Sequence, residues 1–287
     1  MVKFKRDATG PGQVIDRRGA GGGYRPGMRT IGVGGGAVGI IVLLLVTLLG
    51  GGGDLSGLTE VLQPPGEVQN EGTLDPNADP ETDQAAFLEA VLQDDQTMWT
   101  GIFQESGLEY RPTNLVLFNG STQSECGGAQ AQSGPHYCPI DELVYMDLDF
   151  LAELQRRFGA AGDTAQAYIL AHEVGHHVQH QLGVTEQVQS AGTNEASIAL
   201  ELQADCFAGV WLSTLKSGES AAILEGGDLE EALNAAAAVG DDAIQQQTGQ
   251  VNPETWTHGS SEQRYQWLNQ GFTSGSPSSC DTFAGAT

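Results

Sequence analysis

The segment His172-Glu173-Val174-Gly175-His176 fixes the local structure more tightly than any other part of the sequence, because it matches the pattern H-E-x-x-H. Four residues make just over one helical turn, so on a helix both imidazoles project from one face about 6 Å apart and can hold one metal ion. Glu173 lies beside this pair without having to ligate, as a general base acting on water requires. The segment therefore predicts a metal-binding helix.

A third ligand is expected on a later helix. Glu201 follows His176 by twenty-five residues and shares a helix face with Asp205. Glu201 completes a set of two histidines and one carboxylate, which leaves a fourth position open on zinc. Asp205 is predicted to accept the far N–H of a ligating histidine, His172, and so to fix its tautomer. The alternative for both acids is a solvated helix face.

Other histidines have weaker cases. The metzincin pattern would need glycine at 179 and histidine at 182, where this chain has Gln179 and Leu182. His177 and His180 are expected to be surface residues, since neither shares the position of the ligand pair.

His258 precedes a helix that begins near Ser260, and it is a candidate for stabilising the oxyanion of a tetrahedral intermediate. A structural role at the helix start is an equal alternative. Tyr145 is a weaker candidate for the same task, with ordinary strand packing as its alternative.

Cap residues and apolar spacing predict an α+β fold that is mainly helical with a small β-sheet. The expected helices cover residues 80–105, 164–182 and 195–217, with further helices starting at Asp228 and Ser260, and the expected strands cover 115–118 and 143–148.

Charge is divided unevenly along the chain. Residues 1–50 carry seven Lys/Arg and two Asp/Glu, whereas residues 51–287 carry five and thirty-five. Nucleic acid is therefore excluded as a partner, because binding its phosphates depends on Lys and Arg.

An uncharged run of nineteen residues covers 31–49, close to the roughly 20 residues that a membrane-spanning helix needs. Arginines precede the run, so the positive-inside rule predicts a single-pass membrane protein with a cytoplasmic N-terminus and an extracytoplasmic domain. A cleaved signal peptide is the alternative. The predicted division is a basic segment 1–30, a transmembrane helix 31–49, a flexible acidic Gly/Pro tether 50–79 and a catalytic domain 80–287.

Four cysteines, an even number, lie beyond the apolar run, and an oxidising compartment would permit disulfides there. Cys126 and Cys138 flank a short polar loop, which leaves Cys206 for Cys280 by elimination. Three pairings are open, and zinc–thiolate binding is disfavoured because no Cys-x-x-Cys spacing exists.

Several segments together resemble the family named "putative neutral zinc metallopeptidase", whose members are membrane-anchored bacterial proteins with a helix pair similar to that of gluzincins. They are Asp16–Gly19, Gly134–Pro139, Val144–Leu148, Arg157–Ala160, Ala165–Tyr168, His172–Gln179, Glu201–Cys206 and His258–Arg264. The resemblance implies a zincin-like fold and a zinc-bound site more firmly than it implies a substrate.

These observations predict a zinc metalloendopeptidase that binds one Zn²⁺ per chain at His172, His176 and Glu201, with Glu173 as general base and a peptide or protein as substrate. A zinc-stabilised binding or scaffold protein without turnover is the alternative, and hydrolysis of another amide, such as cell-wall peptide, also stays open.

Overall fold

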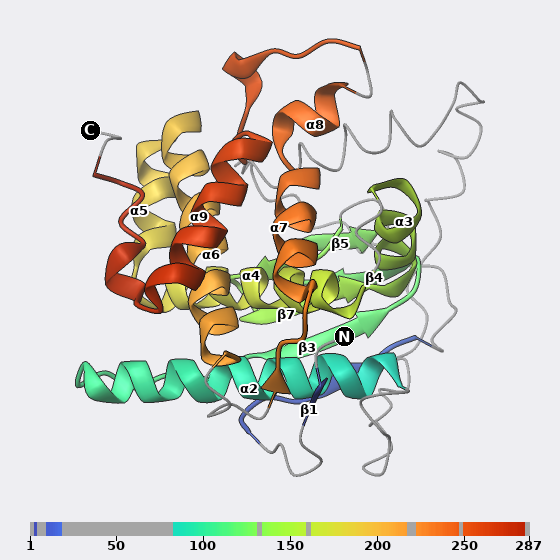
Figure 1. Cartoon of the computed structure of the whole chain (residues 1–287), viewed down its shortest axis with the longest axis vertical. Coiled ribbons are helices and arrows are strands. Elements are labelled where there is room, and N and C mark those ends of the chain that lie inside the picture. The colour runs from blue at the N-terminus through green and yellow to red at the C-terminus, as the bar shows by residue number, and fades with distance from the viewer. Residues whose placement is uncertain are drawn as a thin grey trace.

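A computed structural model of the chain describes residues 3–4, 10–18, 83–130, 134–158, 162–216, 222–246 and 249–284. Helices α4, α6, α7 and α9 lie on one side of the long helix α2, with a small sheet beside them (Figure 1). The predicted apolar run 31–49 and the tether 50–79 lie outside the described residues. The segment boundaries at residues 30, 49 and 79 stay predictions.

The central sheet has four strands in the order β2-β3-β7-β6. The first three are parallel, and β6 pairs antiparallel with β7. The strands β3 and β7 are almost wholly buried, which explains their continuous apolar runs. The bounds are Val14–Asp16 (β2), Asn114–Phe118 (β3), His136–Cys138 (β6) and Leu143–Asp147 (β7).

Two small antiparallel ladders complete the strands. Strand β1 (Lys3–Phe4) pairs with β8 (Ala222–Ile223), and β4 (Ser121–Ser124) pairs with β5 (Gly127–Gln130). The pairing of β1 with β8 places an N-terminal segment beside a late part of the chain.

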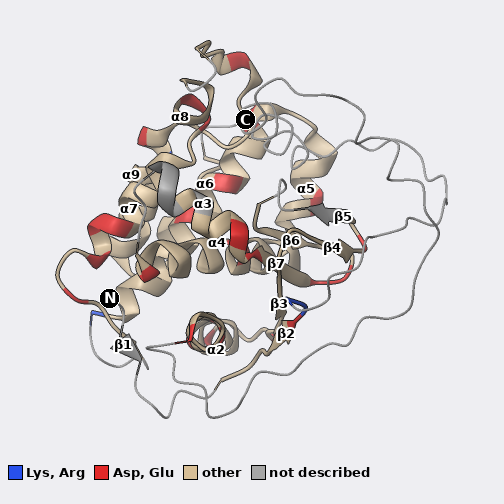
Figure 2. Ribbon diagram, turned by 90° about the vertical axis from the view of Figure 1, so that its right-hand side faces the viewer, with Lys and Arg blue, Asp and Glu red and all other residues tan. Residues whose placement is uncertain are grey.

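Helix α2 (Gln84–Glu105) begins at Asp83, whose side chain accepts the backbone N–H groups of Ala85 and Ala86. Its apolar face includes Leu88 and Trp99 and packs against α4. In Figure 2 this helix is seen end-on below the rest of the fold. The prediction of a helix over 80–105 agrees with the structure from residue 84 onward.

Helices α4 (Asp163–Gln181) and α6 (Asn194–Thr214) cross closely, and the short helix α5 (Val184–Ala191) connects them. A Cβ atom on Gly175 would lie 3.2 Å from Ala204 Cα, so glycine lets the two backbones approach at this crossing. This contact sets how near residues of α6 come to the H-E-x-x-H segment.

Helix α9 (Ser261–Ser274) packs along α6. Ser260 and Gln263 form a full capping box at its start. Gly209 and Gly271 make the contact possible, because a Cβ on either would overlap backbone atoms of the facing helix. The remaining helices are α3 (Leu148–Phe158), α7 (Asp228–Ala238), α8 (Asp241–Gln246), η3 (Pro253–Thr255) and η4 (Pro277–Ser279).

Both disulfides follow the pairing reached by elimination. Cys126 is bonded to Cys138, and Cys206 on α6 is bonded to Cys280 after η4. No cysteine is free, so a zinc–thiolate site is excluded. The second disulfide fastens the C-terminal segment to the helix that carries Glu201.

The predicted single-pass topology is wrong. No helix in the described ranges has the length and apolar character that crossing a bilayer requires. The longest, α2 and α6, carry several acidic residues and pack inside the fold. Moreover, β2 precedes the apolar run yet pairs with β3, which follows it. The two sides of the run therefore belong to one sheet, so a cytoplasmic N-terminus cannot be combined with a domain across a membrane.

Candidate metal centre

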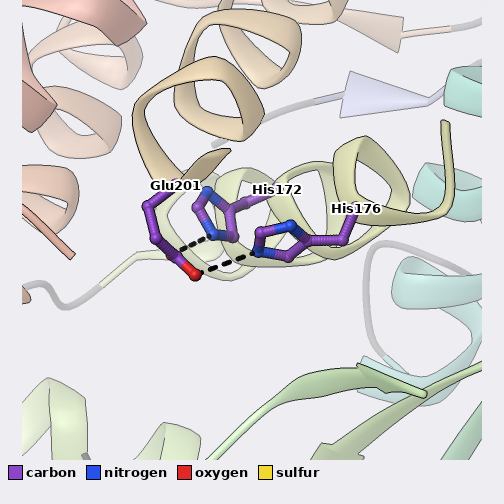
Figure 3. A group of neighbouring side chains, drawn as sticks. All are labelled: His172, His176 and Glu201. Carbon is purple, nitrogen blue, oxygen red and sulfur yellow. Dashed lines mark ion pairs between the residues drawn. The ribbon is translucent and has the colours of Figure 1, made fainter. Parts of the chain in front are cut away.

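Three predicted ligands come together at the crossing of α4 and α6 (Figure 3). One ligand atom from each of His172, His176 and Glu201 lies within 4.8 Å of the others. The two Nε2 atoms face the same carboxylate, at 3.3 Å for His172 and 3.6 Å for His176. Among the described residues, this is the one group of three or more such side chains with a spacing that could hold a metal ion.

The spacing of the ligand atoms fits a tetrahedral ion. Zinc bonds to nitrogen or oxygen of about 2.0–2.1 Å place neighbouring ligand atoms about 3.3 Å apart. The separation of His172 Nε2 from Glu201 Oε2 is 3.3 Å and that of His176 Nε2 from Glu201 Oε1 is 3.6 Å, so each histidine lies near that distance from one carboxylate oxygen. The site is also partly open, since the side chains of His176 and Glu201 are 16% and 15% exposed. Water can therefore reach these side chains.

The far side of His172 is held by Asp205. Its Nδ1 lies 2.8 Å from Asp205 Oδ1, which also accepts the hydroxyl of Tyr168 at 2.6 Å. Arg264 donates to both oxygens of the same carboxylate, at 2.8 and 2.9 Å. All four residues are buried. The predicted partner of His172 is thus a carboxylate saturated with donors, which leaves Nε2 of His172 for the metal.

Arg264 balances the charge of Asp205 inside the protein. Burial alone would raise the pKa of Asp205, but Arg264 and His172 outweigh it and lower that pKa to about 2. Asp205 is therefore ionised and neutralised by a permanent cation. The charge of Glu201 remains available for the metal.

The metal-free ligands interact strongly with one another. Burial would lower the pKa of His172, but Asp205 and Glu201 raise it to about 9. Burial likewise opposes the net rise in the pKa of His176, which Glu201 causes. The same histidines, together with His258, hold the pKa of Glu201 well below its usual range despite burial. A proton and a metal ion would therefore compete for the same nitrogen atoms.

Glu173 lies on α4 between His172 and His176 in sequence and is 7% exposed. Burial lowers the pKa of His176, whereas the charge of Glu201 and, more weakly, that of Glu173 raise it. The predicted base therefore lies within electrostatic reach of the ligand cluster and is not itself part of it.

His258 lies in a buried loop just before α9, held by Asp241 of α8. Asp241 Oδ2 accepts the backbone N–H groups of Thr257, His258 and Gly259 at 2.8, 2.7 and 3.1 Å. Asp241 Oδ1 lies 3.3 Å from His258 Nδ1. Burial would raise the pKa of Glu201, but His176 and, after it, His258 lower that pKa, so His258 is electrostatically coupled to the cluster.

The other candidates lie apart from the cluster. His177 is fully buried, not on the surface as predicted, with Nδ1 2.9 Å from Tyr137 Oη and Nε2 2.6 Å from the Arg111 carbonyl oxygen. His180 faces Glu186 at 2.9 Å. Tyr145 donates to Asp141 and stacks on His136, in line with the packing alternative.

Sequence reasoning missed four residues that support the site: Tyr168, Gln179, Asp241 and Arg264. Gln179 Oε1 lies 2.8 Å from His176 Nδ1, so it does for His176 what Asp205 does for His172. Its spacing of three from His176 on one helix was an available signal. Tyr168, Asp241 and Arg264 reach the site through tertiary contacts. The one available signal was Arg264 itself, an arginine within a helix of a chain that has few cationic residues.

Comparison with known proteins places these residues in a family. The chain is 43% identical over 279 residues to "Uncharacterized protein YpfJ" of Escherichia coli (strain K12), covering 94% of this chain and 95% of the relative. It is 47% identical over 189 residues to "Uncharacterized protein Rv2575" of Mycobacterium tuberculosis (strain ATCC 25618 / H37Rv), covering 62% of this chain and 64% of the relative. No solved structure matches. The model of the family described as "Putative neutral zinc metallopeptidase" matches residues 3–283, and the chain belongs to that family.

Proposed function

We propose that this protein is a zinc-dependent metalloendopeptidase, with Zn²⁺ held by His172, His176 and Glu201, one ion per chain. One observation carries the proposal: three ligand atoms converge within 4.8 Å in a partly open site. The family description supports a hydrolase of this kind. A closed set of four protein ligands would have favoured a structural site instead.

The chemistry divides between the metal and the chain. Zinc, when bound, acts as a Lewis acid toward a carbonyl and makes a water molecule acidic near neutral pH. Glu173 takes the proton from the attacking water and later delivers it to the leaving amine. Its position between the ligating histidines, without being a ligand, suits that role.

His258 is proposed to stabilise the negative charge that develops on the substrate oxygen. Asp241 holds the loop through three backbone N–H groups and faces Nδ1 of the ring. The other ring nitrogen, Nε2, is then the one presented to substrate. Asp241 is a positioning residue in this account.

The test is zinc content together with cleavage of an unstructured protein such as casein, comparing wild type with Glu173→Gln. The full chain is used, because β2 lies before residue 80 and belongs to the sheet. We expect one zinc per chain in both proteins and cleavage by the wild type alone. Cleavage by Glu173→Gln at the wild-type rate would refute the role of Glu173.

Two other outcomes would change the proposal itself. One zinc in both proteins with no cleavage in either would favour the zinc-stabilised binding or scaffold role. If the wild-type protein holds no zinc after dialysis against a zinc-containing buffer, the metal site is refuted.

A further inference from the structure

A row of hydrogen bonds leads from the ligand His176 to the C-terminal segment. His176 Nδ1 lies 2.8 Å from Gln179 Oε1. Gln179 Nε2 donates to the Leu200 carbonyl at 2.7 Å and to Gln203 Oε1 at 3.1 Å. Gln203 Nε2 then donates to the carbonyl of Cys280 at 3.0 Å. We call these links the glutamine relay.

The direction of the relay is fixed by its ends. The backbone carbonyls of Leu200 and Cys280 can only accept, so both amide nitrogens must face them. Gln203 therefore presents oxygen to Gln179, and Gln179 presents oxygen to His176. His176 Nδ1 must then carry the hydrogen, which leaves the lone pair on Nε2, the atom that faces Glu201. The relay thus selects the tautomer that can ligate a metal.

Each polar atom of the Gln179 side chain is engaged in a hydrogen bond. The side chain is fully buried, both of its N–H groups donate and its oxygen accepts. One of its acceptors is the carbonyl of Leu200, the residue before the ligand Glu201. A single side chain therefore ties one ligand on α4 to the backbone beside another ligand on α6.

The last acceptor of the relay depends on a disulfide. Cys280 is bonded to Cys206, three residues after Gln203 on α6, and both cysteines are buried. Beyond it, Thr282 donates to the Ala199 carbonyl at 2.6 Å. The disulfide therefore fixes the Cys280 carbonyl over Gln203.

We propose that Gln179 and Gln203 are positioning residues for the metal ligand His176, and that the disulfide-held C-terminal segment sets the metal affinity of the site through them. The inference rests on the proposed function, because it takes His176 to be a ligand. It gives the Cys206–Cys280 disulfide a role in metal binding that the Cys126–Cys138 disulfide does not share.

The experiment measures zinc affinity by competition with a chromogenic chelator, using the full chain of four variants. Gln179→Met should weaken zinc binding by about 10- to 100-fold, as the loss of a hydrogen-bond partner of a ligand does. Gln203→Met and the double variant Cys206→Ala/Cys280→Ala act one step further away and should weaken it by about 2- to 30-fold. The matched control Cys126→Ala/Cys138→Ala should bind zinc as the wild type does.

A second readout separates positioning from general stability. Co²⁺ is substituted for zinc, and its visible absorption spectrum reports the ligand geometry. The spectrum should change in Gln179→Met and Gln203→Met and stay unchanged in the control. This result should not depend on the unfolding free energies of the metal-free proteins, which urea denaturation measures separately.

Each outcome bears on the proposal. Wild-type zinc affinity and an unchanged cobalt spectrum in Gln203→Met would overturn the proposal. If Cys206→Ala/Cys280→Ala does not fold, Gln203→Met alone decides, because that variant keeps the disulfide. Equal zinc weakening in both cysteine double variants would also overturn the proposal. If the wild type itself binds no zinc, the proposed function fails together with this inference.

Discussion

Asp205 contacts both a candidate metal ligand and a buried arginine, so it is expected to affect metal binding and stability. Its two oxygens receive hydrogen bonds from the candidate ligand His172, from Tyr168 and from Arg264, all of them buried. A carboxylate in this position both orients the ligand and neutralises a buried cation. A substitution there has two separable effects.

We expect Asp205→Asn to weaken zinc binding by about 10- to 100-fold, since the acceptor for His172 loses its charge. The variant should also lose about 3–5 kcal/mol of unfolding free energy, because Arg264 is left as an uncompensated buried charge. Chelator competition and urea denaturation measure the two effects. The matched control is Asp94→Asn on α2, whose side chain accepts from Trp211. It should bind zinc normally, and a parallel loss of zinc affinity there would contradict the assignment.

His177 makes the unfolding free energy depend on pH. Burial lowers its pKa to about 4, from an ordinary value of 6.5. The unfolded chain therefore binds more protons between those values, so the unfolding free energy falls as pH falls from about 6.5 toward 4, by up to about 3 kcal/mol.

His177→Gln should remove this slope. The measurement is urea denaturation of metal-free wild type and variant at pH 7 and pH 5. We expect the wild type to lose more stability than the variant between these two values. Equal losses would show that His177 is not the group responsible.

At the scale of elements, the helices were predictable because their ends carry local signals. The start at Ser260 and the stop at Gly183 follow from cap chemistry. Helix α7 begins at Asp228 as expected, but it follows Gly227 without a side-chain cap. Helices α4 and α6 lie within a few residues of their predicted bounds. Helix α3 follows β7 without a separating turn, so the sequence there contains no glycine or proline to mark where the helix starts. Strand β2 has only three residues in a basic segment, too few for a pattern.

The site was predictable to a similar degree. Spacing alone grouped His172 with His176 and Glu201 with Asp205, and the structure brings these side chains together, while their roles stay predictions. Asp241 and Arg264 act from other helices, so their roles depend on tertiary packing that no local pattern encodes.

Helices α6 and α9 depend on glycine where they touch. Gly271→Ala should lower the unfolding free energy by about 1–3 kcal/mol or more, because its Cβ would overlap the Cys206 carbonyl and force the helices apart. Thermal and urea denaturation measure this loss. Gly101→Ala on α2 is the control: a Cβ there meets nothing within 4 Å, so stability should hold or rise by about 0.5–1 kcal/mol. Equal effects at the two glycines would contradict the packing argument.

At the scale of the whole molecule, the N-terminal segment belongs to the fold that holds the site. Val14 is 5% exposed and joins the main core, and Val14–Asp16 forms an edge strand on β3. Gln96 of α2 also donates to the Pro11 carbonyl. A catalytic fragment starting at residue 80, which sequence alone suggests, would lack these contacts.

Val14→Asn should therefore destabilise the protein by about 2–4 kcal/mol, through lost apolar burial and an unsatisfied amide. Gln13→Ser, at the exposed neighbouring position, should change stability by less than about 0.5 kcal/mol. Both are measured by urea denaturation of the full chain. A neutral Val14→Asn would mean that β2 contributes nothing to the folded domain.

The long separation between paired segments has a consequence for biosynthesis. Strand β2 is synthesised about a hundred residues before its partner β3. In the same way Asp205 is made before Arg264, and Cys206 before Cys280. Ribosomes add roughly 5–20 residues per second, and contacts distant in sequence form late. A nascent chain thus contains its H-E-x-x-H segment long before the buried partners of that segment are made, so tight metal loading would have to follow the synthesis of Arg264 and Cys280.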